Sequence, residues 1–304
     1  MGLDRDEVNR QRGYFIAKDN QLITRSRYSL STQQHKLLLY MISKIRPDDI
    51  GNEEYTIRTK DIVDVCGYTQ DSGFYYQSIK RDIQKIAAVS CWIETEPGRE
   101  KLFRWIDTAE LDHGRAEFTI KFHSTVIPYL FELRRNYTQY SLYNLLCLSR
   151  KYSIRLYEYL LAMQYRGIFE VSISELKKRI DAEQYTKISH FKERVLEPAI
   201  LDINDYTELN MEYVYKKTGR SITHVIFRYR EEDNISYSIS HLLREAKIDP
   251  ERRKSARERK KYIEERRKKI REEEEAIQGE GSVTAQMTLE ELITSLEGGA
   301  HENN

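Results

Sequence analysis

The chain has 304 residues, a length that suffices for two ordinary domains and a tail. Hydrophobic residues make up 39% of it and charged residues 33%, and the formal net charge is +1 at pH 7. It contains no run of about 18 apolar residues and no apolar signal core near its N-terminus, so we expect neither a membrane span nor a secretory leader. The three cysteines, Cys66, Cys91 and Cys147, are too scattered for a disulfide framework, so we expect reduced thiols and a cytoplasmic location.

The first predicted elements lie between residues 30 and 67. Leu30 and Ser31 form a helix-start signal, and the apolar residues that follow recur at helical spacing, which predicts a helix. The stripe on this helix consists of Leu38, Met41, Ile42 and Ile45. The stretch 55–67 then predicts a short alternating strand followed by a second helix.

Residues 74–104 predict a third helix and a hairpin. The apolar stripe of this helix consists of Tyr75, Ile79, Ile83 and Ala87. The chain then runs into two strand-like segments that turn at Pro97 and Gly98, a pair of residues typical of turns.

The same order of elements returns further along the chain. The segments 148–163, 169–181 and 189–206 repeat the earlier helices and strand at offsets of 118, 114 and 116 residues, and a second hairpin turns at 217–219. An internal repeat of this kind has to be interpreted before any single motif. The order helix, strand, helix, helix, strand, turn, strand is that of a winged helix-turn-helix, although other small α+β domains share it.

We therefore predict an α+β fold with two tandem winged helix-turn-helix domains and a charged helical C-terminal tail. The predicted parts are an N-terminal extension (1–18), an N-terminal winged-helix domain (19–135), a C-terminal winged-helix domain (136–245) and the tail (246–304).

The third helix of the second unit begins with SHFKERVLEPAI and contains Pro198. A proline in a helix interior costs about 3 kcal/mol, so we expect a kink in the C-terminal half of this helix. The N-terminal half stays available for the major groove of DNA, and it carries Lys187, His190 and Arg194 beside an apolar face. A surface helix with a solvated basic face is the alternative interpretation.

The tail has an uneven charge distribution. Residues 250–278 carry 12 Lys and Arg against 8 Asp and Glu, whereas residues 279–304 carry none against 5. Because isoleucines occur only once per heptad, we interpret 250–278 as a solvated single helix or as an auxiliary DNA- or partner-binding helix. The amphipathic stretch MTLEELITSLEGG at 287–299 is interpreted as a docking motif for a host replication protein.

Two stretches, one in each unit, carry longer motifs. NQLITRSRYSLSTQQHKLLLYMISKI (20–45) contains an Asn-x-Leu-Ile segment, a Leu-Ser helix start and a Lys-Leu-Leu core helix. HFKERVLEPAILDIND followed by LNMEYVYKKTGRSITHVIFRY, both within 190–229, contains a Phe-Lys-x-Arg-Val-Leu-x-Pro-Ala helix and a Lys-Lys-x-Gly-Arg turn. In this order they resemble the iteron-type plasmid replication initiator family, over residues 19–230 but not the tail.

This resemblance implies two winged helices of common ancestry that bind direct repeats (iterons) at a plasmid origin, where the protein opens an adjacent A+T-rich region. It also implies the recruitment of host replication proteins, such as an initiator, a helicase or a chaperone. It further implies that a monomer binds the repeats, while a dimer, paired through the N-terminal domain, represses its own gene through an inverted repeat.

Lysine and arginine contacts to phosphates supply affinity for double-stranded DNA, and contacts to base edges specify the sequence. In the second unit the expected contacts are Lys187, Ser189, His190, Lys192 and Arg194 on the third helix and Lys216, Lys217 and Arg220 on the wing. In the first unit they are Gln77, Ser78, Lys80, Arg81 and Lys85 on the matching helix and Arg99 and Lys101 on its hairpin. Each charged residue also suits an ordinary solvated surface position.

Sequence motifs of enzymes are absent. The chain has no His-hydrophobe-His pair, no Gly-Lys-Ser/Thr phosphate loop and no Cys-x-x-Cys or His-Glu-x-x-His metal pattern, so we expect no catalysis, metal or cofactor. We interpret Asp202 and Asp205 as an exposed pair in a turn after the third helix, without a catalytic role. A winged-helix repressor without an initiator role, and a nickase or primase, are the alternatives.

Overall fold

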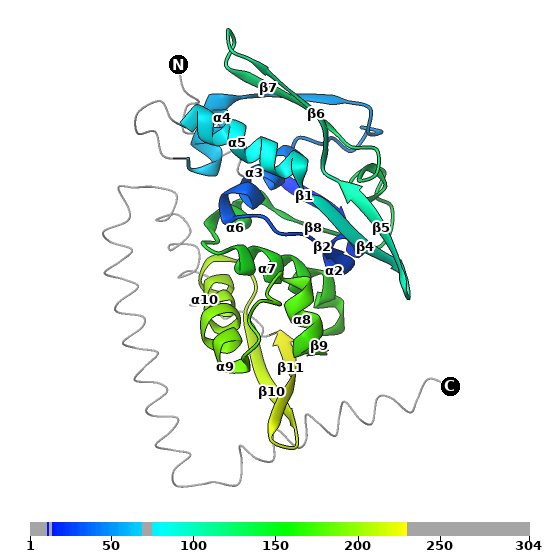
Figure 1. The fold of residues 1–304 in the computed structure, drawn as a ribbon, viewed down its shortest axis with the longest axis vertical. Coiled ribbons are helices and arrows are strands. Elements are labelled where there is room, and N and C mark those ends of the chain that lie inside the picture. The colour runs from blue at the N-terminus through cyan, green and yellow to red at the C-terminus, as the bar shows by residue number, and fades with distance from the viewer. Residues whose placement is uncertain (1–10, 12–13, 69–74, 230–304) are drawn as a thin grey trace, which may run out of the picture. The chain divides into compact units, whose positions relative to one another are not determined.

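The computed structural model describes residues 11, 14–68 and 75–229, all within the unit Met1–Arg244 (Figure 1). The predicted tail helix and the predicted docking motif at 287–299 lie outside the described residues. The described chain consists of two halves with corresponding central elements. We call them the first half (14–147) and the second half (148–229).

Three helices, α3, α4 and α5, form the centre of the first half. α3 (Thr32–Ile42) begins after Ser31, whose Oγ accepts a hydrogen bond from the Gln34 N–H at 3.2 Å while the Gln34 side chain accepts one from the Ser31 N–H at 2.9 Å. This reciprocal cap pairs two backbone donors that a helix start leaves unsatisfied, and it confirms the predicted start. α4 (Thr59–Cys66) and α5 (Tyr75–Ala88) follow as predicted.

The second half repeats this arrangement with α7, α8 and a longer third helix. α7 (Lys151–Met163) and α8 (Ile173–Arg179) precede a continuous helical stretch. That stretch consists of α9 (Ile188–Phe191), the π turn η4 (Lys192–Leu196) and α10 (Glu197–Tyr206), and we call it the recognition helix.

The sheet of the second half confirms the winged-helix topology. β9 (Ile168–Ser172), β10 (Met211–Thr218) and β11 (Ser221–Tyr229) form an antiparallel sheet in the order β10-β11-β9. The β10–β11 hairpin follows the recognition helix and extends beyond the helices as the wing (Figure 1). It turns at Gly219, whose φ of 62° lies in the left-handed region that favours glycine.

The hairpin that follows α5 is not the counterpart of this wing. β4 (Ser90–Glu96) and β5 (Arg99–Arg104) turn around Pro97 and Gly98 as predicted, but β4 pairs with β2 (Ser26–Arg27). The resulting sheet, in the order β2-β4-β5, does not contain the strand that precedes α4. The predicted position of the first wing was therefore wrong.

The first wing is a later hairpin, formed by β6 (Ile106–Asp112) and β7 (Glu117–Phe122). β7 pairs with β3 (Glu54–Arg58), the strand that precedes α4, so the order β6-β7-β3 corresponds to β10-β11-β9 of the second half. The alternating burial of Phe118, Ile120 and Phe122 marks β7 as a strand. Its partner cannot be read from that pattern, because residues this far apart along the chain leave no local signal of their pairing.

A two-stranded sheet closes the first half. β1 (Phe15–Asp19) pairs with β8 (Tyr137–Ser141), so most of β1 comes from the predicted extension and β8 from the part assigned to the second domain. The remaining short elements are the helices α2 (Asn20–Arg25) and α6 (Leu142–Cys147) and the 3₁₀ turns η2 (Ile127–Tyr129) and η3 (Gln164–Arg166).

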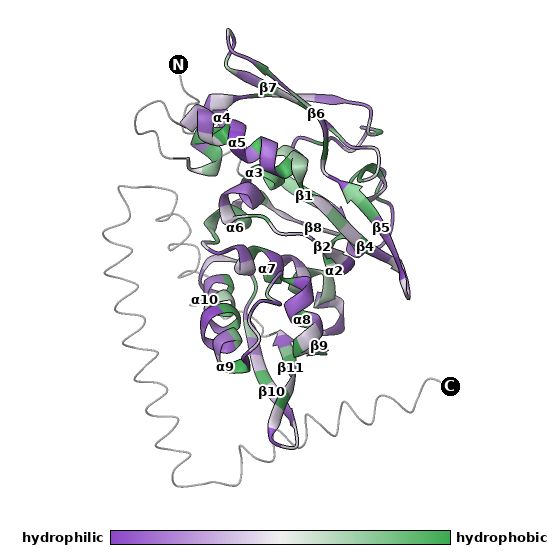
Figure 2. Ribbon diagram, viewed as in Figure 1, coloured by the Kyte–Doolittle hydropathy of each residue, from purple (hydrophilic) through white to green (hydrophobic). Residues whose placement is uncertain are grey.

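Helix α7 packs between elements of both halves, against α2 and β8 of the first half and α8 and α10 of the second (Figure 1). Nearly every residue of its central part, from Ser153 to Leu160, is buried. A surface helix of a globular protein buries one face and leaves the other in water, so α7 is a core element that both halves share. Figure 2 shows that it nevertheless carries hydrophilic residues among the hydrophobic ones.

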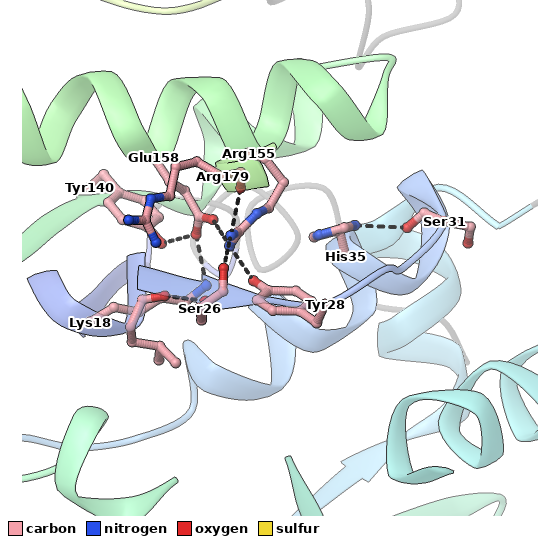
Figure 3. A network of polar contacts seen from close by, with 10 residues as sticks. Lys18, Ser26, Tyr28, Ser31, His35, Tyr140, Arg155, Glu158 and Arg179 are labelled. Atoms are coloured by element: carbon pink, nitrogen blue, oxygen red, sulfur yellow. Dashed lines mark hydrogen bonds and ion pairs between the residues drawn. The ribbon is translucent and has the colours of Figure 1, made fainter. Parts of the chain in front are cut away.

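The hydrophilic residues of α7 form a buried cluster of charges with the first half (Figure 3). Glu158 accepts hydrogen bonds from Lys18 Nζ, at 2.7 Å, and from the Tyr140 hydroxyl, and the Lys18 and Glu158 side chains are at most 2% exposed. Arg155 donates from Nη1 to the Tyr28 hydroxyl at 2.8 Å. Burial raises the pKa of Glu158, but the charges of Lys18 and Arg155 outweigh burial and hold that pKa below its ordinary value.

Replacing Glu158 by Gln is expected to lower the free energy of unfolding by about 3 kcal/mol, because Lys18 and Arg155 then remain buried without their counter-charge. Urea denaturation at pH 7 measures the loss. Glu96→Gln, which removes an exposed ion pair with Arg99, is the control and should change stability by less than about 1 kcal/mol.

The same substitution has a defined pH dependence. Because the pKa of Glu158 is depressed in the folded state, its stabilising effect is present above the ordinary value of 4.5 and is lost as the pH falls through the lower, folded-state value. The stability curves of the wild type and Glu158→Gln should therefore converge in acid. A constant difference at every pH would contradict an ionised Glu158.

His35 on α3 is a buried histidine beside the same cluster (Figure 3). Burial, together with the positive charge of Arg155, lowers its pKa from 6.5 to about 4. The unfolded chain therefore takes up this proton first, and the protein should lose stability as the pH falls from 6.5 toward 4. Urea denaturation at several pH values across that range gives the free energy of unfolding, which should fall less steeply with falling pH in His35→Gln than in the wild type. An equal fall in the two proteins would contradict a depressed pKa of His35.

Candidate nucleic-acid interface

The turn between α8 and the recognition helix, residues 180–187, is held by side chains beneath it. Lys177 Nζ donates a hydrogen bond to the Tyr185 carbonyl oxygen at 2.6 Å. The Tyr185 ring packs edge-on against the Tyr152 ring of α7, and Gln184 Nε2 donates to the Tyr152 hydroxyl at 2.8 Å. The helix-turn-helix of the second half is thus positioned by α7.

The recognition helix has one apolar face and one polar face, as its sequence predicts. The apolar face is fully buried and consists of Phe191, Val195, Ala199 and Ile203. Of the predicted DNA contacts, the exposed ones are Lys187, Ser189 and Arg194, and the half-buried ones are His190 and Lys192. The three exposed side chains leave hydrogen-bonding groups in solvent, where they can bind phosphates or base edges.

The irregularity before Pro198 is the π turn η4, at residues 192–196. It lies in the N-terminal half of the helical stretch and contains Lys192 and Arg194, so the expected position of the kink, in the C-terminal half, was wrong. The Glu197 N–H bonds to the Lys192 carbonyl oxygen, five residues back instead of four. In a regular helix the Pro198 ring would collide with the carbonyl of Arg194, four residues earlier, and its missing N–H would leave that carbonyl unpaired. The wider turn places Pro198 in the first turn of α10, where proline is tolerated.

Two of the predicted contacts have partners within the second half: Lys192 links the recognition helix to the sheet, and Lys216 pairs within the sheet. Lys192 Nζ lies 4.4 Å from the centre of the Tyr215 ring on β10 and 4.0 Å from Glu197 Oε1. Lys216 Nζ donates to Glu170 Oε2 on β9 at 3.2 Å. These two lysines therefore have structural partners, whereas Lys217 and Arg220 are exposed at the end of the wing, a hydrophilic part of the hairpin (Figure 2).

In the first half, α5 presents the matching set. The exposed residues are Gln77, Arg81 and Lys85, and the half-buried ones are Ser78 and Lys80. At the start of α5 the Tyr76 hydroxyl lies 3.1 Å from Nδ1 of His113, at the turn of the β6–β7 hairpin. The helix and the wing of the first half therefore contact each other.

The structure separates Arg99 and Lys101 from this helix and wing. Both lie exposed on β5, in the sheet β2-β4-β5, and Arg99 Nη1 pairs with Glu96 Oε2 at 3.2 Å. At the turn of the first wing the basic side chain is Arg115, which sequence reasoning missed. The sequence does carry a signal for this hairpin, namely the turn-like stretch DHGRA (112–116) followed by the alternating strand EFTIKF (117–122).

The expectation of an exposed aspartate pair after the recognition helix was wrong. Asp202 and Asp205 lie within α10 and are only 4% and 7% exposed. Asp202 accepts hydrogen bonds from the Ser149 N–H at 2.8 Å and the Ser149 hydroxyl at 3.1 Å. It thereby ties α10 to the residues that precede α7, where a carboxylate also complements the positive end of the helix dipole.

No group of three or more potential metal ligands occurs among residues 11, 14–68 and 75–229. Over the same part of the chain, no helix combines the length and the apolar character that a bilayer crossing needs.

Comparison with known families agrees with the two-domain geometry. Residues 15–161 match the first winged-helix domain of the family described as Initiator Replication protein, WH1. Residues 172–229 match the family's second domain, described as Initiator Rep protein, WH2. The chain belongs to the initiator Rep family. All but the last two residues of helix α7 fall within the match to the first domain, in keeping with its contacts to the first half.

Individual relatives of this initiator Rep chain are distant. It is 27% identical to a replication initiation protein of Escherichia coli over 229 residues, which cover 70% of this chain and 68% of the relative. A 27.6 kDa protein of Escherichia coli is 20% identical over 69% of this chain and 93% of its own. The crystal structure of the Pi initiator protein in complex with iteron DNA matches with a TM-score of 0.58 and 21% identity, over 73% of this chain and 99% of that one.

Replacing Arg194 by Ala should lower the affinity for the specific DNA site about tenfold to a hundredfold and leave non-specific binding little changed, because a forked arginine contact to a base discriminates by about 1–3 kcal/mol. Lys217→Ala should weaken specific and scrambled duplexes alike and reduce the salt slope by about 1. Fluorescence anisotropy over a salt series measures both effects. Arg166→Ala, at an exposed arginine on η3, is the control.

Equal weakening of both duplexes by Arg194→Ala would contradict a base contact and would place Arg194 against the phosphate backbone instead.

Proposed function

We propose that this initiator Rep protein starts plasmid replication by binding direct repeats of double-stranded DNA, iterons, at the origin. The observation that carries the proposal is the presence of two winged helices in one unit, each with a third helix that exposes basic or amide side chains. Two such helices suit a DNA site in which each winged helix contacts its own segment of the duplex. The Pi initiator, which shares this fold, is seen bound to iteron DNA, and this supports the same class of ligand here.

The proposed action is binding and distortion of DNA in the cytoplasm, without a catalytic step. Binding several repeats side by side strains the adjacent A+T-rich duplex, whose opening gives host replication proteins access to single strands. Contacts with a host initiator, helicase or chaperone belong to this proposal, and so does repression of the protein's own gene.

Self-association through the first half is also part of the proposal. Trp92 on β4 and Leu102 on β5 are cross-strand neighbours, and their side chains are 48% and 40% exposed. The opposite face of the same hairpin, with Cys91, Ile93 and Phe103, is buried. Because β5 is an edge strand, this apolar pair lies where a second copy can add to the sheet.

Footprinting of the purified protein on the DNA that flanks its own gene tests the function. We expect protection of several direct repeats whose centres are separated by multiples of about 10.5 bp, because successive copies then bind the same side of the duplex. Affinity should fall steeply with salt, since phosphate contacts release counterions.

Protection of a single inverted repeat at the promoter, with no direct repeat bound at any protein concentration, would show a winged-helix repressor instead. A parallel assay for nicking and primer synthesis in the presence of Mg²⁺ should give no product. A product that an active wild-type preparation forms would favour the nickase or primase alternative.

A further inference from the structure

The first half holds the helix-turn-helix of the second half by side chains at the end of α8. From this end, residues 180–187 lead into the recognition helix. Two groups hold this end: the segment 26–29 of the first half, which follows α2, and Arg155 of α7, whose guanidinium group also contacts the first half. The contacts on either side of this end therefore determine how the recognition helix is oriented relative to the first half.

Arg155 bridges the two halves with one guanidinium group (Figure 3). Toward the first half, Nη1 donates to the Tyr28 hydroxyl at 2.8 Å and Nη2 to the Ser26 carbonyl oxygen at 3.1 Å. Toward the second half, Nη2 donates to the carbonyl oxygen of Arg179, the last residue of α8, at 2.9 Å. The side chain is 3% exposed, and its Cζ lies 4.3 Å from the centre of the Tyr28 ring. A planar group with donors in a fixed fork sets an angle as well as a distance, which a lysine cannot do.

Asp181 is held two residues further along. Its Oδ2 accepts a hydrogen bond from the Ser29 hydroxyl at 2.7 Å, across the boundary between the halves, and another from Lys151 Nζ at 2.7 Å. Its φ is 59°, in the left-handed region that aspartate and asparagine adopt more readily than most residues. The backbone reversal that starts the turn is thus tied to the first half by a side chain at the reversal itself.

Arg179 adds a third link. Its Nη2 pairs with Glu175 on the same helix and lies 4.0 Å from Glu94 Oε2 on β4. The end of α8 therefore contacts the sheet β2-β4-β5, to which Ser26 also belongs. We call Ser26, Tyr28, Ser29, Arg155, Arg179 and Asp181 together the joint.

We propose that the joint holds the recognition helix at one distance and one rotation from the first half, so that the protein accepts its two contacted DNA segments at a single spacing. One extra base pair between those segments moves them apart by about 3.4 Å and rotates them by about 34°. Ser29, Arg155 and Asp181 thus determine spacing specificity without touching DNA. This inference rests on the proposed function, because it assumes that both halves contact one site.

The test compares duplexes that carry the footprinted repeat with duplexes in which one base pair is inserted or deleted between its two protected segments. The proteins are the full-length wild type, the double variant Ser29→Ala/Asp181→Asn, and Arg155→Lys as a second, charge-preserving variant. Asp48→Asn, which removes one exposed carboxylate outside the joint, is the matched control. Thermal unfolding establishes first that each variant is folded.

Insertion of one base pair between the two segments should lower the DNA affinity of the wild type and the control about tenfold or more, since one half of the protein then loses its contacts with DNA. The joint variants should bind the native spacing roughly 5–50-fold more weakly and lose clearly less on insertion, because a loosened joint follows the displaced segment. A merely structural defect lowers affinity for all spacings by one factor and does not change this ratio.

If insertion of a base pair lowers the affinity of the joint variants by the same factor as that of the wild type, the proposed role of the joint is wrong. A wild type that tolerates the insertion would contradict that role as well. Should footprinting reveal an inverted operator in place of repeats, the proposed function fails, and the same insertion test on that operator still decides the joint.

Discussion

The arrangement of the two halves depends on the buried helix α7, which packs against elements of both. Most of the central part of α7 is buried, and it carries Arg155 and Glu158 where a core helix ordinarily carries only apolar residues. Removing ions from water is tolerated only where opposite charges and hydrogen-bond partners are in place. Lys18, Tyr28 and Tyr140 supply those partners from the first half, so electrostatics specify the contact as well as apolar burial.

The recognition helix shows how a local constraint is absorbed within one continuous helical stretch. Pro198 cannot continue a regular helix, and the π turn before it inserts the extra residue that removes the clash. The apolar face stays continuous on both sides of the turn, from Phe191 to Ile203, and this burial stabilises the irregular backbone. Of the exposed basic residues on this helix that were predicted to contact DNA, Lys187 precedes the turn and Arg194 lies within it.

The two winged helices differ in the elements between the third helix and the wing. The second half follows the plain order, with the wing directly after the recognition helix. The first half inserts the β4–β5 hairpin between α5 and its wing, and this hairpin pairs with β2 next to the joint. The insertion adds an exposed apolar pair on one face and a contact to α8 through Glu94. Among the described residues, the sheet β2-β4-β5 has no counterpart in the second half.

The sequence by itself determined the three central helices of each half, their order and the repeat, because helical periodicity and capping are local properties. The Ser31 start of α3 and the apolar face of the recognition helix were both predicted and both found. Tertiary structure alone decided which hairpin forms the first wing, since β3 and β7 pair across two intervening helices, the β4–β5 hairpin and β6. It also decided the burial of Lys18 and Asp202, whose neighbours come from distant parts of the chain. A charged residue looks solvated in sequence, and only the folded chain brings the partner that makes its burial possible.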